Sequence, residues 1–171
     1  MPVLYKVLPV EGKGLGVVAS QFIKRGSLIL KEQRQMPTLS SLNSSIIQET
    51  IDQFSCIQAR TYFYKMRKSD QEGYMELFDK YESEFAKNDA KHSSELVIIK
   101  SLVRDIEKDP KEARKIVKII CILMTNSFKS GVSIKMSRLN HSCHPNAVVI
   151  GDDVRAISDI QFGQEITITY R

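Results

Sequence analysis

Short runs patterned as β-strands lie at the two ends of this chain, and a long segment patterned as helices separates them. Residues 1–40 and 129–171 carry β-branched and aromatic residues between glycine-containing turns, whereas residues 41–128 show helical spacing. Neither end alone has enough strands to cover both faces of a sheet, and no Pro-, Gly- or Ser-rich linker marks a boundary. The sequence therefore predicts one α+β domain, 1–171, with a helical insertion; a separate helical domain is the alternative.

The two β-patterned ends contain recognisable strands and turns. The runs "LYKVLPV" and "GLGVVASQF" flank a turn at 11–14, and a strand at 28–30 follows a turn at 25–26. Near the other end, "NAVVIGDDVRAI" predicts a hairpin around 151–153. The final run "FGQEITITYR" alternates apolar and polar residues, which predicts a half-buried strand that points Tyr170 inward.

The middle segment predicts four helices, because apolar residues recur there at steps of three and four. Ser44 and Ser45 are cap candidates for the first helix. Asp109 caps the fourth, with Pro110 at the first helical position and Glu112 completing a capping box, and that helix is expected to run to the stop at 130–131. The four stripes are Ile47, Ile51, Phe54 and Ile57; Tyr74, Leu77, Phe78, Tyr81 and Phe85; Leu96, Ile99, Leu102, Val103 and Ile106; and Ile116, Val117, Ile120, Leu123 and Met124.

Composition narrows the class of protein. No apolar run approaches the roughly 20 residues of a membrane helix, and 1–13 lacks the pattern of a signal peptide. Cys56, Cys121 and Cys143 fit no disulfide framework, and the first two are expected in the core. The net charge of +5 is concentrated near the N-terminus without a nucleic-acid-binding pattern. We expect an intracellular monomer, nuclear or cytoplasmic, that binds neither membrane nor nucleic acid.

The densest polar segment is "RLNHSCHPN" at 138–146, and it permits three interpretations. As a metal site it offers His141, Cys143 and His144, but these crowd within four residues and lack a second ligand pair. As a nucleophile, Cys143 needs a base held by a third group. As a polar loop, its side chains satisfy backbone groups around Pro145. The segment alone leaves these alternatives open.

Two other features are expected to meet this polar segment. The run "GKGLG" at 12–16 lacks the GK[ST] ending and the following helix of a phosphate-binding loop, and it leads into a strand instead. Glycines at such a turn allow the backbone to lie close to a ligand. The last strand delivers Tyr170, the second-last residue. We therefore expect a pocket formed by a Gly-rich backbone, the polar segment and a tyrosine.

Three motifs in this order, "GKGLGVVAS", "RLNHSCHPN" and "FGQEITITY", resemble the SET domain family of protein lysine methyltransferases. The run "FIKRGSLILKE" is similar to the following SET strand, and "TNSFKSG" is similar to the SMYD branch, although the MYND zinc finger is absent. The resemblance implies an α+β fold of small β-clip-like sheets with a pseudoknot at the C-terminal motifs and a large helical insertion. A post-SET segment is expected to be absent, since the sequence stops one residue after Tyr170.

The resemblance also implies an activity. It implies direct methyl transfer from S-adenosylmethionine to a lysine of a protein substrate, histone or non-histone, with no metal. The alternative is a non-catalytic SET-like module that binds a peptide or protein partner.

Site residues follow from the resemblance, position by position. Tyr170 is the implied catalytic residue, Phe128 lines the lysine channel, and Asn140 binds the cofactor through its side chain. His141 holds the adenine edge through its backbone. The implied cofactor-binding set is Lys13, Gly14, Leu15, Asn126, Asn140, His141 and Tyr170, and the residues that brace the polar segment are Arg138, Ser142 and Asn146.

Overall fold

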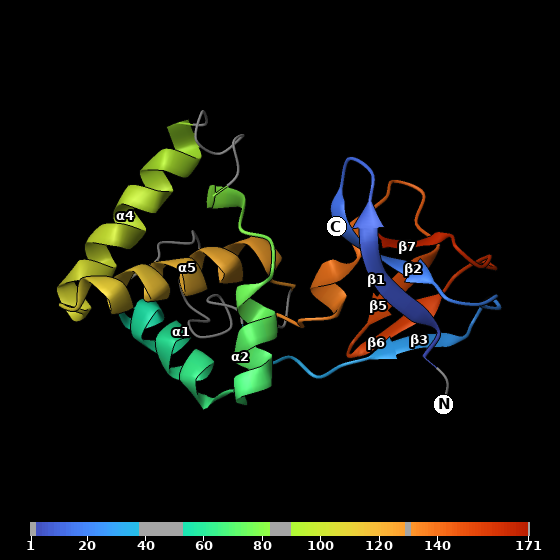
Figure 1. The fold of residues 1–171 in the computed structure, drawn as a ribbon, viewed down its shortest axis with the longest axis horizontal. Helices are drawn as coiled ribbons and strands as arrows, with labels where there is room; N and C mark the ends of the chain where they lie inside the picture. Colours follow the sequence, from blue (N-terminus) through green and yellow to red (C-terminus); the bar gives the residue numbers. More distant parts are fainter. Residues whose placement is uncertain (1–2, 38–52, 83–89, 129–130, 171) are drawn as a thin grey trace. The chain divides into compact units, whose positions relative to one another are not determined.

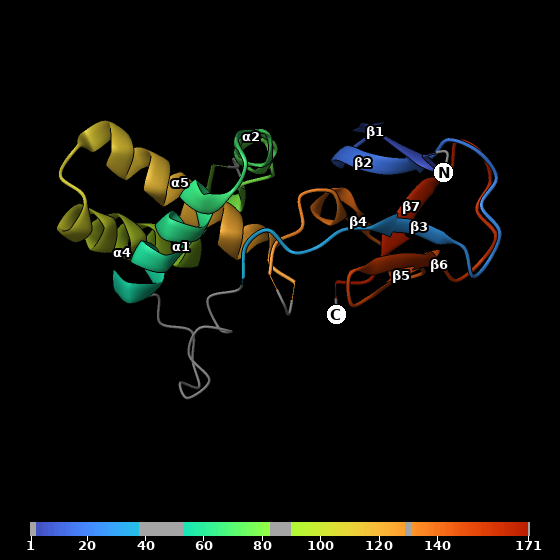
Figure 2. The same ribbon diagram turned by 90° about the horizontal axis from the view of Figure 1, so that it is seen from below.

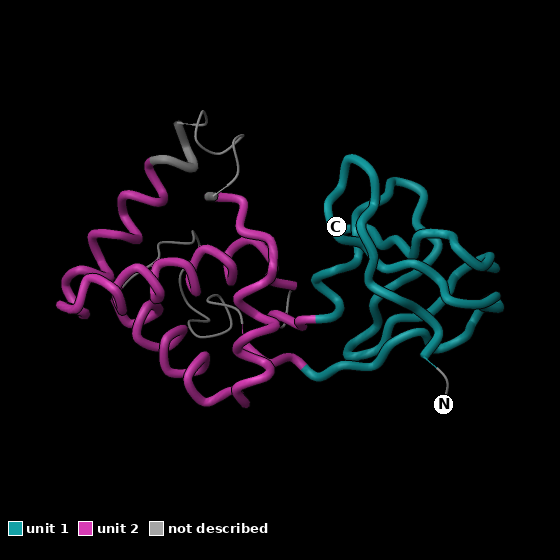
Figure 3. Tube along the Cα trace, in the orientation of Figure 1, with its two compact units in different colours: residues 1–33, 135–171 teal, residues 34–134 magenta. Residues whose placement is uncertain are grey.

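A computed structural model describes residues 3–37, 53–82, 90–128 and 131–170. The chain divides into two compact units, of which the first comprises residues 1–33 and 135–171 and the second residues 34–134 (Figure 3). Both β-patterned ends thus belong to one unit and the helices to the other, in an α+β architecture. The assignment of the whole chain to a single domain stays a prediction.

The first unit contains two small sheets (Figure 1). Strands β1 and β2 lie on one side of β7, and β3, β5 and β6 lie on the other (Figure 2). The four-stranded sheet has the order β1 (Tyr5–Val10), β2 (Gly14–Ala19), β7 (Glu165–Ile168) and β4 (Asn140–His141), and the three-stranded sheet has the order β3 (Leu28–Lys31), β6 (Asp153–Ala156) and β5 (Ala147–Ile150).

Strand β7 joins the two ends of the chain. It pairs antiparallel with β2, where Val17 faces Ile166, and parallel with β4, where Asn140 faces Thr167. It also contacts β5 of the other sheet. Because β7 is covered on both faces, Thr167 is buried along with Ile166 and Ile168, and the prediction of a half-buried strand is wrong.

The predicted turns of the first unit are confirmed. Gly26 has φ +85° at the turn before β3, and Gly151 has φ +60° in the β5–β6 hairpin. Both values lie in the left-handed region that glycine adopts without steric cost.

The second unit is built around α5 (Pro110–Asn126), which contacts α1 (Gln53–Lys65), α2 (Lys68–Met75) and α4 (Ala90–Ile106). A short 3₁₀ helix, η2 (Lys80–Glu82), also contacts α5. Six apolar side chains of α5 are almost fully buried, which explains why its apolar pattern is so dense: Ile116, Ile119, Ile120, Cys121, Ile122 and Leu123.

The start of α5 confirms one predicted cap and corrects another. The Asp109 carboxylate accepts from the Lys111 backbone N–H at 3.1 Å, and Pro110 follows it at the first helical position. The capping box is wrong, because Glu112 accepts from the Tyr64 hydroxyl, and the Asp109 N–H donates to Glu107 instead. The helix ends at Asn126, ahead of the expected stop.

The other predicted stripes have mixed outcomes. Ile99 and Val103 of α4 are buried as predicted. Phe54 and Ile57 of α1 are exposed, since the neighbouring face of that helix packs inward. The second stripe forms no single helix, because α2 ends at Met75. The residues of that inward face are Cys56, Ala59 and Phe63. The predictions for Ser44, Ser45, Ile47, Ile51, Phe85 and Ser130 concern positions outside the described residues.

Within the described residues, no helix combines the length and apolarity that crossing a membrane requires.

Candidate functional site

The polar segment 138–146 is positioned by a buried carboxylate at the end of β3. Glu32 is 9% exposed and accepts from the backbone N–H groups of Lys135 and Met136, at 2.8 and 3.2 Å. These are the first N–H groups of the 3₁₀ helix η3 (Met136–Arg138), which lack partners within the helix. Glu32 therefore fixes the start of η3, and η3 leads directly into β4.

Asn146 anchors the other end of this segment to β7. Its Nδ2 donates to the Glu165 carbonyl at 2.8 Å, and its Oδ1 accepts from the Thr167 N–H at 2.9 Å. The side-chain amide thus satisfies one backbone acceptor and one backbone donor, as a neighbouring strand would. Nearby, the Ser142 N–H donates to the Ile168 carbonyl at 2.9 Å, and the Ser142 hydroxyl accepts from the His144 N–H at 3.1 Å. Asn146 and Ser142 brace the segment as predicted.

We expect Asn146→Ala to lower the free energy of unfolding by about 2 kcal/mol, because it leaves two backbone groups of a buried strand without partners. Urea denaturation of both proteins measures the difference. Gln161→Ala, which removes an exposed amide in the same unit, is the control and should change stability by less than about 0.5 kcal/mol. Equal stability of wild type and Asn146→Ala would contradict the anchoring role.

A hydrogen-bonded cluster connects the Gly-rich turn with β4 and β7. The Glu165 carboxylate accepts from the Asn140 amide at 2.8 Å and forms an ion pair with the Lys13 ammonium at 2.7 Å. Asn140 Nδ2 also lies 3.3 Å from the Leu15 carbonyl. Gly16 makes this approach possible, because a Cβ there would lie 2.8 Å from Asn140 Nδ2 and 3.0 Å from Glu165 Oε1.

The partners of Asn140 fix which end of its amide is open. A carboxylate and a carbonyl only accept hydrogen bonds, so the group facing Glu165 and Leu15 is the NH₂. Its oxygen has no hydrogen-bond partner among the described residues, so it is the atom that can meet a ligand. Asn140 therefore offers an acceptor, which suits an ammonium or another donor.

The Gly-rich turn presents its backbone differently at each residue. The Lys13 N–H already donates to the Val10 carbonyl at 3.0 Å, so only its carbonyl is open. Gly14 has φ +76°, where a side chain would be strained. Leu15 is 45% exposed at the start of β2.

The structure places Tyr170 differently from the prediction. Strand β7 ends at Ile168, and Tyr170 lies beyond it with 63% of its surface exposed, so an inward ring is wrong. Its hydroxyl is the sheltered part and donates to the Leu139 carbonyl at 2.8 Å. Partial burial raises the pKa of Tyr170 above its ordinary value of 10.0. At neutral pH the hydroxyl therefore keeps its proton and is not a general base.

His141 sits against Tyr170. The Tyr170 N–H donates to His141 Nδ1 at 3.2 Å, and the two rings lie 5.3 Å apart. Because Nδ1 accepts, a neutral His141 carries its proton on Nε2, which lies 3.6 Å from the Cys143 sulfur. Tyr170 is thus attached to β4 through its main-chain N–H, and to Leu139, the residue before β4, through its hydroxyl.

The metal and nucleophile interpretations gain no support from these contacts. Cys143 is exposed, and its neighbour His141 is oriented by a backbone N–H and not by an acidic group. No three His, Cys, Asp or Glu side chains gather in a metal-binding arrangement among the residues that the structure describes. The expectation that the chain binds no metal stays a prediction.

Two predicted site residues belong to the second unit. Asn126 donates to the carbonyls of Phe78 and Ile122, at 2.7 and 2.8 Å, and so closes the end of α5. The Arg34 guanidinium lies over the Phe128 ring, with its central carbon 5.5 Å from the centroid of that ring. Their assignments to cofactor and lysine channel stay predictions.

Sequence reasoning missed Gly16 and Glu165 as site residues. Gly16 lies within the quoted Gly-rich run, and Glu165 is the only acidic residue of the last strand. That single acid in an otherwise apolar and threonine-rich strand was the available signal. The strand pattern could not show which residues Glu165 contacts, because its partners Lys13 and Asn140 are far from it in the sequence.

This fold, two small sheets joined through β7 with a helical insertion, has known relatives. The family model described as "SET domain" matches residues 14–171, so the chain belongs to the SET domain family. No curated protein matches significantly in sequence.

Solved structures resemble the chain over almost its whole length. The SET domain of LSMT bound to lysine and AdoHcy is 18% identical with a TM-score of 0.56, covering 99% of this chain and 49% of that one. Rubisco LSMT bound to AdoMet is 16% identical with a TM-score of 0.56. Rubisco LSMT bound to sinefungin and monomethyllysine is also 16% identical, with a TM-score of 0.58. Each alignment covers 99% of this chain and 48% of the other. This likeness establishes the fold, and the chain spans about half the length of these relatives. The SMYD branch is not specifically supported.

Proposed function

We propose that this protein transfers a methyl group from S-adenosylmethionine to a lysine side chain of a protein substrate. One observation carries the proposal: Asn140 has an open acceptor oxygen and is fixed by Glu165 beside the backbone of the Gly-rich turn. The family membership supports it, as do similar structures described as bound to AdoMet, AdoHcy and lysine.

The residues present fit the amino-acid end of such a cofactor. Its ammonium is a donor, which suits the Asn140 oxygen and the open carbonyl of Lys13. Gly14 and Leu15 are exposed residues at the start of β2, and His141 is an exposed residue of β4. When bound, the cofactor supplies an electrophilic methyl group on a sulfonium centre.

The chain's own task is to align a neutral lysine amine. A free lysine amine has a pKa of about 10.4, and enclosure near a positive charge lowers it. Tyr170 keeps its proton and uses it on the Leu139 carbonyl, so its oxygen lone pairs can accept from the incoming amine. This arrangement makes Tyr170 a positioning and orienting group in a reaction that depends on alignment.

Finer assignments belong to the same proposal. In this proposal Asn126 contacts the cofactor and Phe128 lines the lysine channel. The "TNSFKSG" run relates the chain to the SMYD branch. The protein acts as an intracellular monomer that binds neither nucleic acid nor membrane. The competing proposal is a non-catalytic module that binds a peptide. The exposure of Tyr170 favours it in one respect, because a catalytic tyrosine must be enclosed when substrate binds.

We expect S-adenosylhomocysteine to bind the wild-type protein, and Asn140→Ala to weaken binding about tenfold because an oriented acceptor is lost. Isothermal titration calorimetry measures both affinities. The exposed-amide variant Gln161→Ala should bind like the wild type. Absence of binding to a folded wild type at millimolar ligand would remove the cofactor from the proposal.

We expect Tyr170→Phe to lower methyl transfer by at least about tenfold, about 1.4 kcal/mol in the barrier, because the oxygen that orients the amine is removed. Stability should fall by at most about 1 kcal/mol, since one partly exposed hydrogen bond is lost. Radiolabelled transfer to a panel of lysine-containing proteins, with urea denaturation in parallel, measures both. Transfer at the wild-type rate would exclude Tyr170, and no transfer by a cofactor-binding wild type would favour the binding module.

A further inference from the structure

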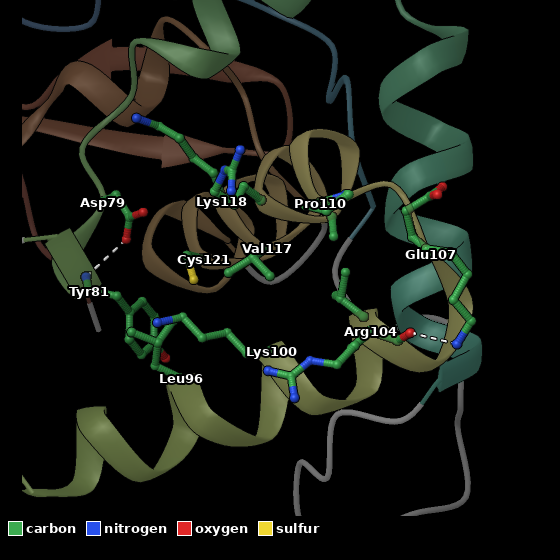
Figure 4. Close-up of a pocket in the computed structure, with 14 residues that line it drawn as sticks. Asp79, Tyr81, Leu96, Lys100, Arg104, Glu107, Pro110, Val117, Lys118 and Cys121 are labelled. Carbon is green, nitrogen blue, oxygen red and sulfur yellow. Dashed lines mark hydrogen bonds between the residues drawn. The ribbon is translucent and has the colours of Figure 1, made fainter.

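The second unit contains a groove of about 560 Å³ between α4 and α5, and none of the residues that line it is implicated in methyl transfer. Figure 4 shows Leu96, Lys100 and Arg104 on α4 and Val117 and Cys121 on α5 around it. Its apolar lining runs along both helices and consists of Leu96, Val103, Ala113, Val117 and Cys121.

The charged lining of the groove is strongly unbalanced. Among the residues that the structure describes, five basic residues line it against two acidic ones, Asp79 and Glu107. Asp79 is 8% exposed and accepts from the Tyr81 N–H, and Glu107 lies 3.3 Å from the Arg60 guanidinium, which is outside the lining. Glu107 is thus paired with a cation outside the lining, and Asp79 keeps its charge, so the basic residues still outnumber the acidic ones and the groove presents a net positive charge. The basic residues are Lys100, Arg104, Lys108, Arg114 and Lys118.

The spacing of these cations works against the stability of the helices that carry them. Lys100 and Arg104 are four residues apart on α4, and Arg114 and Lys118 are four apart on α5. Like charges at this spacing cost a helix about 0.2–0.5 kcal/mol per pair. An anionic occupant beside Lys100 and Arg104 would reduce the repulsion between them, which favours a negatively charged ligand over a neutral one.

The dimensions of the groove fit a helical segment. On α4 the lining extends from Leu96 to Arg104, about two turns or 12 Å, and on α5 it extends from Pro110 to Cys121, about three turns or 16 Å. An amphipathic helix can bury apolar residues spaced i, i+3, i+4 and i+7 in such a groove. We propose that the groove between α4 and α5 binds an acidic, amphipathic helical segment of a partner protein.

Binding of a segment in this groove does not depend on methyl transfer, and the whole chain is used to measure it. The probe is a fluorescein-labelled, helix-forming peptide of about 15 residues with leucines on one face and glutamates on both sides of them. Fluorescence anisotropy should show binding that weakens as salt is raised. The double variant Lys100→Glu/Arg104→Glu should bind at least about tenfold more weakly because attraction becomes repulsion.

Controls separate the groove from general attraction of acidic peptides to a basic protein. Lys6→Glu/Lys24→Glu makes the same change in net charge on the other unit and should alter affinity by less than about threefold. A peptide with serines in place of the leucines should bind at least about tenfold more weakly, since the apolar floor is left uncovered. Equal affinity for both peptides, equal effects of the two double variants, or tighter binding of a short RNA at the same residues would overturn the proposal.

Discussion

Gly16→Ala is expected to weaken binding of S-adenosylhomocysteine by at least about a hundredfold, about 2.7 kcal/mol. The added Cβ would lie 2.8 Å from Asn140 Nδ2 and 2.7 Å from Val10 Cγ2, closer than a carbon approaches such atoms, and 3.0 Å from Glu165 Oε1, which is a tight contact. The Asn140 amide must leave its place, and the Leu15 carbonyl loses its partner with it. The variant therefore removes the interaction lost in Asn140→Ala and also shifts the Glu165 carboxylate and the Val10 side chain beside it.

Overpacking at Gly16 also costs about 1–3 kcal/mol of stability, so binding must be measured on protein shown to be folded. Calorimetry of the ligand and urea denaturation provide the two readings. Gly73→Ala is the matched control, because its Cβ would meet only the Ile134 side chain at 3.2 Å and the position lies in α2. If Gly16→Ala is folded and binds as the wild type does, the cluster of Asn140 and Glu165 has no part in ligand binding.

Gly131→Ala is expected to destabilise the protein by at least about 3 kcal/mol, the largest effect on stability among these changes. Gly131 has φ +129°, and a Cβ there would lie 2.0 Å from the Met36 carbonyl oxygen. That oxygen accepts from the Val132 N–H at 2.7 Å, so it cannot retreat without breaking this bond. The substitution separates the two segments at which the chain enters and leaves the second unit.

Gly151→Ala separates the two causes of this loss. Gly151 has φ +60° and nothing within 4 Å of its Cβ position, so alanine there carries conformational strain alone, about 1–2 kcal/mol. Urea denaturation should give a much lower free energy of unfolding for Gly131→Ala than for Gly151→Ala. Similar losses would mean that the contact with Met36 relaxes easily and that strain is the whole effect.

Local sequence patterns predicted the elements whose cause is local. The turn at Gly26, the hairpin at Gly151 and the Asp109–Pro110 start of α5 each depend on residues within a few positions of one another. The three motifs likewise identified the SET domain family, and a family model covering residues 14–171 confirms it. Patterns of this kind failed where burial on a second face decided the outcome, as at Thr167, Phe54 and Ile57.

The sequence by itself determined the α+β class, the family and the proximity of the two ends, because these follow from hydrophobic periodicity and from the order of the motifs, which are properties of the linear sequence. Only the tertiary structure decided how the site is built. Glu165 meets Lys13 and Asn140 because β7 pairs with both β2 and β4, and Tyr170 is exposed because β7 ends two residues before it. Contacts between residues so far apart depend on strand pairing and register, which the local pattern of each strand leaves open.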